Sequence, residues 1–531
     1  MSVNRRTFLR SGSAAATALA ILPSRLRAQF GARPEPIASI QDPRLEDLTA
    51  RALDAARAAG AVYADVRLSV TRLRRFLIDR VDDGEAMGVG VRVWVDGYWG
   101  FASSPVWTPD EMARLGREAA HQAKVNATGD PRDMPLAPAT AVRGHWTMPV
   151  AEDPFMISPY EIQDHLASLQ LWIGRVLNLE VPANNLEARA QDKVFASTLG
   201  SYCTQRQYLT TGNLVCGLKR LPNGQAPEFV LDCLSSAGLG FELYTADHLP
   251  RVRDASLRDE VRRQFEETKE DYSLPIKPVN VGRYDTAFDA MTMTHLLDQT
   301  IGRATELDRA LGFEANAGGT SSLSDPRGML GHYQVGASLL TVTGNRSDPG
   351  GASTVKWDDE GVEPDAMTLV KDGVLSDFQT LRETAGWLNA RSHGCAYAPT
   401  AIEAPLQREP NLLLAPRDGG DYSGMVGQLS DGITIKRAKL DVDFQATTGM
   451  GTGMVFSVKN GKRVAWHPGA AFLFRATDLW KALAHVGSEP HVRRFGLASG
   501  KGEPAQLGIH SIAAPPAVIK GVTLVDALRK A

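Results

Sequence analysis

The sequence predicts an α+β protein, in which helices and strands occupy separate blocks of the chain. Three observations support this fold class. Residues 64–103 contain runs that alternate between two faces, as strands do. Residues 290–311 repeat apolar side chains every three or four positions, as an amphipathic helix does. Short strand-like segments separated by turns then follow towards the end of the chain.

Length and charge limit the classes of function. The chain has 531 residues, of which 43% are hydrophobic and 22% are charged, values typical of soluble globular proteins. This length allows two or three domains. The formal net charge of −3 gives no electrostatic reason to expect binding to nucleic acid or to a membrane surface.

Residues 1–28 are predicted to be an export signal. Arg5-Arg6 followed by Phe8 and Leu9 has the pattern of a twin-arginine signal. The apolar stretch Ala14–Leu22 is too short to span a bilayer as a helix. We therefore expect twin-arginine export to the periplasm and no membrane span. The alternative is a merely basic, frayed N-terminus.

The next segment, residues 40–126, is predicted to be a helix–antiparallel sheet–helix domain. An alanine-rich helix over 45–59 precedes the strands. Asp82-Asp83-Gly84 suggests one turn, and Asp96-Gly97 suggests a hairpin. Thr108-Pro109-Asp110-Glu111 then has the capping pattern of a second helix, which runs to about residue 124.

Three further segments complete the predicted organisation. Residues 127–150 are rich in Pro, Ala, Asp and Gly, which indicates a linker. Residues 151–278 form a middle αβ domain, with helices over 158–177 and 258–272 around several strands. Residues 279–531 form a β-rich C-terminal domain that begins near the helix at 290–311.

Cysteines are few for this length and do not form a disulfide framework. No Cys-x-x-Cys pair occurs among Cys203, Cys216, Cys233 and Cys395. Their disulfide state stays open at this level. His393 and Cys395 lie close in sequence, but no base partner can be named for them, so a structural role is the better hypothesis.

The helix at 290–311 has one apolar and one polar face. The apolar stripe comprises Met293, Leu297, Thr300, Ala304, Leu307 and Leu311. The polar face comprises His295, Asp298, Gln299, Arg303 and Glu306. Gly302 lies inside the helix, where glycine costs about 1 kcal/mol relative to alanine, so a packing or geometric reason is expected.

The stretch LLDQTIGRATELDRALGFEANAGGTS resembles the signature helix of the TldD/PmbA family of zinc metallopeptidases. Active members carry His-Glu-x-x-Gly-His there, followed by a Glu-x-Asp segment. Gly302, Glu306 and Asp308 match that pattern. Other family-like blocks are Arg391–Tyr397, Gln407–Asn411 and Ser430–Ile433, so the resemblance covers most of the chain beyond the predicted signal. We call residues 290–311 the signature helix.

The three residues that would define the zinc chemistry are replaced. Asp298 stands at the first histidine, and a carboxylate can still ligate zinc. Gln299 replaces the general base and cannot accept a proton near neutral pH. Arg303 replaces the second histidine and has no acceptor atom. The family's late cysteine ligand is also absent from the approximately matching segment Gly451–Met454. The sequence therefore predicts no bound metal and no other cofactor, although active relatives use zinc.

Two interpretations of Arg303 follow. In one, its guanidinium takes the space of the lost metal and pairs with Glu306 or Asp298. In the other, this is a solvated helix face with a local Arg303–Glu306 ion pair.

The resemblance implies three candidate functions. The first is a zinc-free partner subunit or peptide-binding scaffold, forming a dimer with itself or a heterodimer with a family sister subunit. The second is an active metallopeptidase with another ligand set, such as Asp298 with His295 and Glu306. The third is a periplasmic binding protein for a small ligand. Active relatives act on unfolded or modified peptides, and the family is linked to gyrase modulation and peptide maturation.

Overall fold

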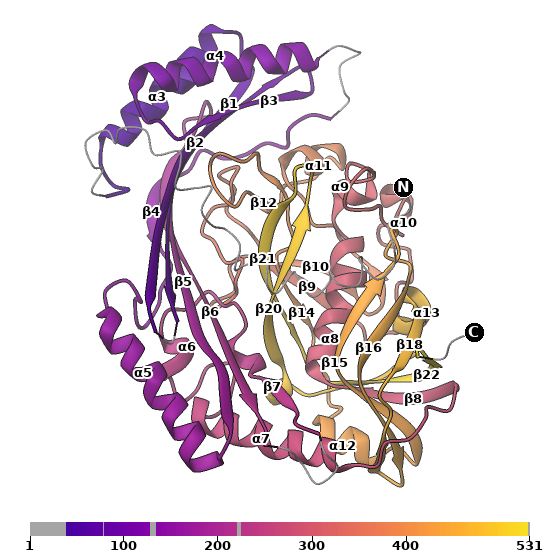
Figure 1. Ribbon diagram of the computed structural model, residues 1–531. Helices are drawn as coiled ribbons and strands as arrows, with labels where there is room; N and C mark the ends of the chain where they lie inside the picture. Colours follow the sequence, from indigo (N-terminus) through magenta and orange to yellow (C-terminus); the bar gives the residue numbers. More distant parts are fainter. Residues whose placement is uncertain (1–38, 78, 128–133, 220–224, 529–531) are drawn as a thin grey trace, which may run out of the picture.

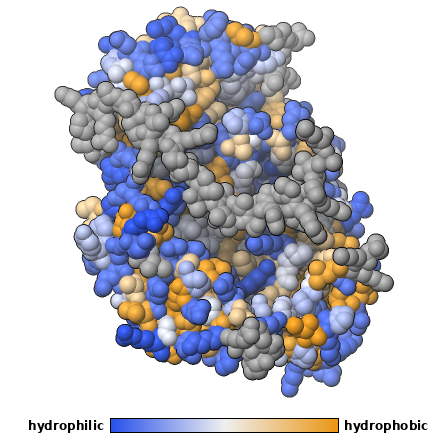
Figure 2. Space-filling view, viewed as in Figure 1, coloured by the Kyte–Doolittle hydropathy of each residue, from blue (hydrophilic) through white to orange (hydrophobic). Residues whose placement is uncertain are grey.

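The computed structural model describes residues 39–77, 79–127, 134–219 and 225–528 and is α+β, as the sequence predicts (Figure 1). The predicted export signal, residues 1–28, lies outside these ranges. Within them, no helix has the length and apolar content needed to cross a bilayer. The face seen in Figure 2 is mostly hydrophilic, and its hydrophobic residues form separate groups.

Two helices cover one end of the N-terminal sheet. These are α3 (Arg44–Ala58) and α4 (Pro109–Asn126), which pack on β1 (Tyr63–Phe76), β2 (Val81–Val95) and β3 (Tyr98–Ser104). Thr108 caps α4 as predicted, since its hydroxyl accepts the N–H of Glu111 at 3.3 Å. The hairpin at Asp96-Gly97 is also confirmed, and both residues have positive φ.

The turn predicted at Asp82-Asp83-Gly84 is wrong, because these residues lie within β2. β1 and β2 form a longer ribbon, since β1 ends only at Phe76 and β2 begins at Val81. Opposite charges face each other across this extension, and Arg74 and Asp83 form an ion pair at 2.8 Å. Cross-strand pairing thus outweighs the local turn preference of Asp and Gly.

The predicted N-terminal and middle domains contribute strands to one sheet. Its order is β3-β2-β1-β5-β6-β4, with β7 paired to β6. The added strands are β4 (Arg143–Thr147), β5 (Glu180–Ser197), β6 (Tyr202–Gly217) and β7 (Glu228–Val230). β4 lies in the predicted linker and runs parallel to β6. β1 pairs with β5 over its length, so the ribbon continues into the middle region.

Helices of the middle region pack beside the lower part of this sheet in Figure 1. They are α5 (Pro159–Trp172), which continues as a π-helix (Ile173–Leu177), α6 (Glu242–Thr245) and α7 (Leu257–Ser273). α5 with its extension and α7 agree with the two predicted helices. Their buried side chains, such as Ile162, Leu166 and Val261, share a core with Leu214 and Phe229 of the sheet.

Two sheets enclose the signature helix in the C-terminal region. The first has the order β11-β10-β9-β14-β21-β20; its strands are β9 (Val342–Asn345), β10 (Met367–Lys371), β11 (Val374–Leu375), β14 (Asn411–Leu414), β20 (Arg493–Lys501) and β21 (Gln506–Ala514). The second has the order β15-β8-β22-β18-β16-β17 and is closed by a β15–β16 pairing; its strands are β8 (Gly282–Phe288), β15 (Asp431–Val442), β16 (Thr448–Lys459), β17 (Lys462–Trp466), β18 (Ala470–Arg475) and β22 (Ala517–Asp526), with β19 (Leu483–Val486) beside β22.

Short elements connect these sheets. They are α10 (Pro326–Met329), α11 (Arg382–Trp387), α12 (Tyr422–Gly427), α13 (Ala476–Lys481), and the two-residue strands β12 (Ala396–Tyr397) and β13 (Leu406–Gln407). β10 and β11 form a hairpin through Lys371-Asp372-Gly373, in which Asp372 and Gly373 have positive φ.

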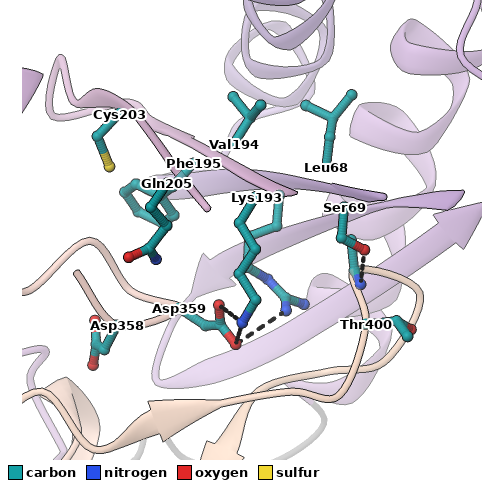
Figure 3. A pocket seen from close by; sticks show the side chains of 12 residues that line it. Leu68, Ser69, Lys193, Val194, Phe195, Cys203, Gln205, Asp358, Asp359 and Thr400 are labelled. Carbon is teal, nitrogen blue, oxygen red and sulfur yellow. Dashed lines mark hydrogen bonds and ion pairs between the residues drawn. The ribbon is translucent and has the colours of Figure 1, made fainter. Parts of the chain in front are cut away.

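Buried ion pairs join the N-terminal sheet to a C-terminal acidic turn, residues 357–361. Lys193 on β5 contacts Asp359 at 2.9 Å (Figure 3). Arg92 on β2 contacts Asp65 on β1 at 2.7 Å and Glu360 at 3.3 Å, and all three side chains are at most 5% exposed. These charged groups are almost completely buried, so the stability of each charge depends on its ion-pair partner.

Candidate functional site

The signature helix is not one regular helix. It starts at α8 (Ala290–Leu296), where the Asp289 side chain caps the N–H of Thr292 at 2.9 Å. A π-helix follows over Leu297–Gly302 and includes Asp298 and Gln299. π-helical turns inside α-helices frequently occur at functional sites. Nothing in the apolar spacing of this stretch distinguishes the wider turn from an α-helix.

The predicted continuation to Leu311 is interrupted at Thr305. Glu306 has extended backbone (ψ 114°), and the short helix α9 (Leu307–Ala310) starts after it. The Gln379 amide stabilises the break by donating to the carbonyl of Gly302 at 2.7 Å and to the Thr305 hydroxyl at 2.9 Å. The break changes the direction of the Glu306 side chain relative to Arg303.

Asp298 lies at the centre of a buried polar cluster. Its side chain is 5% exposed, and its Oδ1 accepts a hydrogen bond from His510 Nε2 at 2.8 Å. The Gln299 amide also donates to Asp298. Burial would raise the pKa of Asp298, but the hydrogen bond and charge of His510 lower it to about 2. Asp298 is therefore held as a carboxylate by protein groups.

Glu409 completes this cluster with Asp298 and His510. Glu409 Oε2 is 3.5 Å from His510 Nε2, and one ligand-type atom from each residue lies within 4.8 Å of the others. Burial and nearby carboxylates raise the pKa of Glu409. Burial lowers the pKa of His510, but Glu409 and Asp298 outweigh it and raise that pKa overall. We call these three residues the Asp298–Glu409–His510 cluster.

The sequence did not identify Glu409 or His510 as site residues. Glu409 directly precedes Pro410 and β14, and His510 lies on β21, which runs parallel to β14. The only signal was the family-like block Gln407–Asn411, which carries Glu409. His510 had no motif of its own, and only strand pairing brings it to Asp298.

Arg303 is half-buried and forms no ion pair with another described residue. Its charge nevertheless lowers the pKa of both Asp298 and Glu409, so it lies close enough to act on them. The expected direct pair with Glu306 is wrong. The physical reason is the helix break between these two residues, which turns Glu306 towards other cations.

Glu306 belongs to a second buried cluster. Lys501 Nζ lies 2.7 Å from Glu306 Oε1 and 2.8 Å from Asp308 Oδ2, and Arg309 Nε lies 3.1 Å from Glu306 Oε2. Burial raises the pKa of Asp308 to about 6 despite Lys501. Lys501 is on β20, so the two family-matching carboxylates are bound by a strand from the end of the chain.

The remaining predicted positions have clear surroundings. An added Cβ at Gly302 would lie 3.0 Å from Leu412 and 3.3 Å from Glu409, which is the packing reason expected for this glycine. His295 is half-buried, and burial lowers its pKa. His295 does not belong to the group of possible metal ligands formed by Asp298, Glu409 and His510. Neither His295 nor Glu306 therefore completes the alternative ligand set suggested from the sequence.

A catalytic zinc of the kind that the resemblance implies does not fit these residues well. One imidazole and two carboxylates are acceptable ligands. The imidazole, however, uses Nε2 for its hydrogen bond to Asp298, and the Arg303 charge acts on both carboxylates. Residue 299 offers an amide where a general base is needed. The charges that a metal would supply are already present as protein side chains.

His393 and Cys395 have structural surroundings. The His393 ring contacts Asp365 at 2.7 Å and Asp377 at 3.0 Å. Burial lowers the pKa of His393, but the two carboxylates outweigh it and raise that pKa to about 9. Burial raises the pKa of Cys395 to about 12. All four cysteines named above are free and buried.

The His393 bridge predicts a pH-dependent stability. Because its pKa is raised, its contribution is complete below about pH 6.5 and is lost as the pH rises through about 9. His393→Gln should cost about 2–3 kcal/mol of unfolding free energy at pH 6 and much less at pH 10. Urea unfolding at both values tests this. The exposed His332→Gln serves as control, and an equal cost for His393→Gln at both values would contradict the interpretation.

Comparisons with known proteins identify the family of the chain. Residues 281–526 match the PmbA/TldA metallopeptidase C-terminal domain, and residues 62–123 match domain 1 of that family. A metalloprotease of Methanocaldococcus jannaschii is 22% identical over 394 residues, covering 71% of this chain and 78% of that protein. A metalloprotease of Methanothermobacter thermautotrophicus is 26% identical over 392 residues, covering 71% and 77%.

Solved structures show the same fold at low identity. A protein of Thermotoga maritima, described as a modulator of a DNA gyrase, aligns with a TM-score of 0.69 and 16% identity, covering 91% of this chain and 100% of that one. TldE from Thermococcus kodakarensis aligns with a TM-score of 0.66 and 13% identity, covering 91% and 99%. With both family domains matched in order and the signature helix enclosed between the C-terminal sheets, the chain belongs to the PmbA/TldD metallopeptidase family.

Proposed function

We propose that this protein is a zinc-free family member that acts as a partner subunit or peptide-binding scaffold. The observation that supports it best is the Asp298–Glu409–His510 cluster. In this cluster the Asp298 carboxylate already accepts a hydrogen bond from His510, and the positive charge of Arg303 lies nearby. A divalent cation would add positive charge to a site whose carboxylates already have cationic neighbours. Gln299 cannot activate a water molecule.

Elemental analysis of protein purified without chelator tests the zinc-free state. We expect far less than stoichiometric zinc, because binding would have to displace the His510 hydrogen bond. Asp298→Ala should leave the trace content unchanged. Stoichiometric zinc that disappears in Asp298→Ala would contradict the proposal.

An active metallopeptidase with another ligand set is the second candidate. It is favoured by the three buried donors at Asp298, Glu409 and His510, which lie within 4.8 Å of one another. Stoichiometric zinc, lost in both Glu409→Gln and His510→Ala, would support it instead of the first candidate.

The partner in the first candidate is a second copy of this chain or a family sister subunit. TldE, named above, is a structural neighbour at the level of the fold. Light scattering on the purified chain distinguishes the two cases: a self-dimer supports the former, and a monomer that dimerises with a co-expressed sister subunit supports the latter.

We also propose twin-arginine export to the periplasm, on the basis of Arg5-Arg6 and the short apolar stretch that follows. The Arg5→Lys, Arg6→Lys variant should remain in the cytoplasm on cell fractionation, because this route requires the paired arginines. Equal periplasmic amounts of variant and parent chain would reject this route.

A further inference from the structure

A cavity of about 490 Å³ lies between the middle region and the C-terminal region, away from the Asp298–Glu409–His510 cluster. Its walls come from α7, α12, β15 and the first residues of α8. α7 and α12 lie at the same end of the molecule in Figure 1. The volume is in the range of small-molecule sites, about 300–1,000 Å³.

The cavity walls carry charges of both signs. Carboxylates come from Asp232 and Asp289, and guanidinium groups come from Arg437 and Arg493. Asp232 pairs with Arg437 at 3.1 Å, and Arg493 pairs with Asp254. A ligand with only one sign of charge would therefore meet repulsion from part of the wall, whereas a ligand with both signs finds a partner for each.

Asp289 is a carboxylate of the cavity wall that can still accept an ion pair from a ligand. Its oxygens accept backbone N–H groups from Thr292 at 2.9 Å and Arg437 at 3.2 Å, and no Lys or Arg of the described chain forms an ion pair with it. Burial raises the pKa of Asp289. Asp289 and other carboxylates also help to raise the pKa of Asp232 to about 6, after the larger effect of burial. An ammonium group in the cavity would relieve this crowding of negative charge.

Two buried polar side chains of the wall have unused hydrogen-bonding atoms. Gln264 on α7 is 3% exposed, and its Oε1 has no hydrogen-bond partner. Arg253 is 1% exposed, and its Nε has none either. Leaving such an atom unsatisfied costs about 1–3 kcal/mol, so these two side chains are held in the wall without their full set of hydrogen bonds.

Apolar side chains line the remaining wall. Val252, Met291, Phe495 and Pro516 contribute hydrocarbon surface to the same space. A bound molecule can thus place an aliphatic or aromatic part against them while its charged groups meet the polar wall.

We propose that this cavity binds a small zwitterionic molecule of amino-acid or dipeptide size. Its ammonium group meets the carboxylates, its carboxylate meets the arginines, and its side chain meets the apolar wall. This inference goes beyond the proposed function, because it concerns a second site and does not depend on the absence of zinc.

Calorimetric titration of the purified chain with free L-amino acids and with dipeptides, in the presence of a chelator, tests the proposal. We expect at least one of these molecules to bind and to raise the melting temperature. Its N-acetylated and C-amidated derivatives should bind at least tenfold more weakly, since each lacks one charge. A complete absence of binding among both sets would overturn the proposal, as would equal binding of the blocked derivatives.

Variants locate the site. Asp289→Asn removes the negative charge that the ammonium group of the ligand would meet, and Ser423→Trp places a large ring at the exposed start of α12, where Ser423 lines the cavity. Each should weaken binding at least tenfold. Ser324→Trp is the matched control, because Ser324 is exposed and lines a different cavity. Unchanged affinity in Ser423→Trp, with the fold intact by circular dichroism, would show a solvent-filled gap between regions rather than a binding site.

Discussion

Replacing Arg92 with methionine should destabilise the protein by about 3–5 kcal/mol, the usual cost of removing one partner from a buried ion pair. Arg92 lies between Asp65 at 2.7 Å and Glu360 at 3.3 Å, and its guanidinium also lies 4.3 Å from the Trp99 ring. Methionine keeps the bulk of the side chain but leaves two carboxylates buried without their ion-pair partner. Unfolding in urea and the melting temperature are the measurements.

The matched control is Arg114→Met on the exposed face of α4. Arg114 pairs with Glu111 and Glu118 at three- and four-residue spacing, and such exposed pairs contribute about 0.3–0.5 kcal/mol each. Adding Asp65→Asn and Glu360→Gln to Arg92→Met should recover part of the loss. A cost for Arg92→Met no greater than that of Arg114→Met would mean that the buried pairs add nothing to the contact between the regions.

The second large effect is expected at Lys501. Lys501→Met leaves Glu306 and Asp308 buried. Among the described residues Glu306 keeps its ion pair with Arg309 and the more distant charge of Arg408, whereas Asp308 loses its ion-pair partner, so a loss of about 3–5 kcal/mol is expected. Adding Glu306→Gln and Asp308→Asn should restore part of the unfolding free energy, because the uncompensated charges are removed. Denaturant unfolding of the single and triple variants measures both changes.

Arg303 supplies the control for this cluster. It is half-buried and forms no ion pair within the described chain, so Arg303→Ala should cost less than Lys501→Met. A double-mutant cycle between Arg303 and Glu306 should give a coupling energy near zero, whereas the Lys501–Glu306 cycle should give a clear coupling. The reverse order would restore the ion pair first suggested from the sequence and would contradict the geometry.

Local patterns predicted the local elements well. The helices at α3, α4 and α7 have apolar faces or caps that can be identified without a structure, and the Asp96-Gly97 hairpin needs only its own two residues. The signature helix was located for the same reason. Its π-helical turn was not predicted, because the apolar spacing does not distinguish it from an α-helix. Its break at Thr305 was not predicted, because it is stabilised by Gln379, which lies 74 residues further along the chain.

The site was predicted only in part, because its members meet through strand pairing. Asp298 was identified from its motif position, but Glu409 and His510 come from β14 and β21, which pair in parallel across about a hundred residues of sequence. No periodicity connects such positions. For the same reason the sequence did not indicate the contact between Lys501 and Glu306, because Lys501 lies on a strand near the end of the chain.

The pairing of β1 with β5 also constrains the order of folding during synthesis. β1 has fourteen residues, and its partner on one side lies more than a hundred residues later. Until the ribosome has released β5, that edge of β1 has no partner and is open to pairing with other chains. Such non-local pairing slows folding. Under the twin-arginine export proposed above, which carries folded proteins, a cytosolic chaperone that covers this edge until translation has passed Ser197 would favour correct folding.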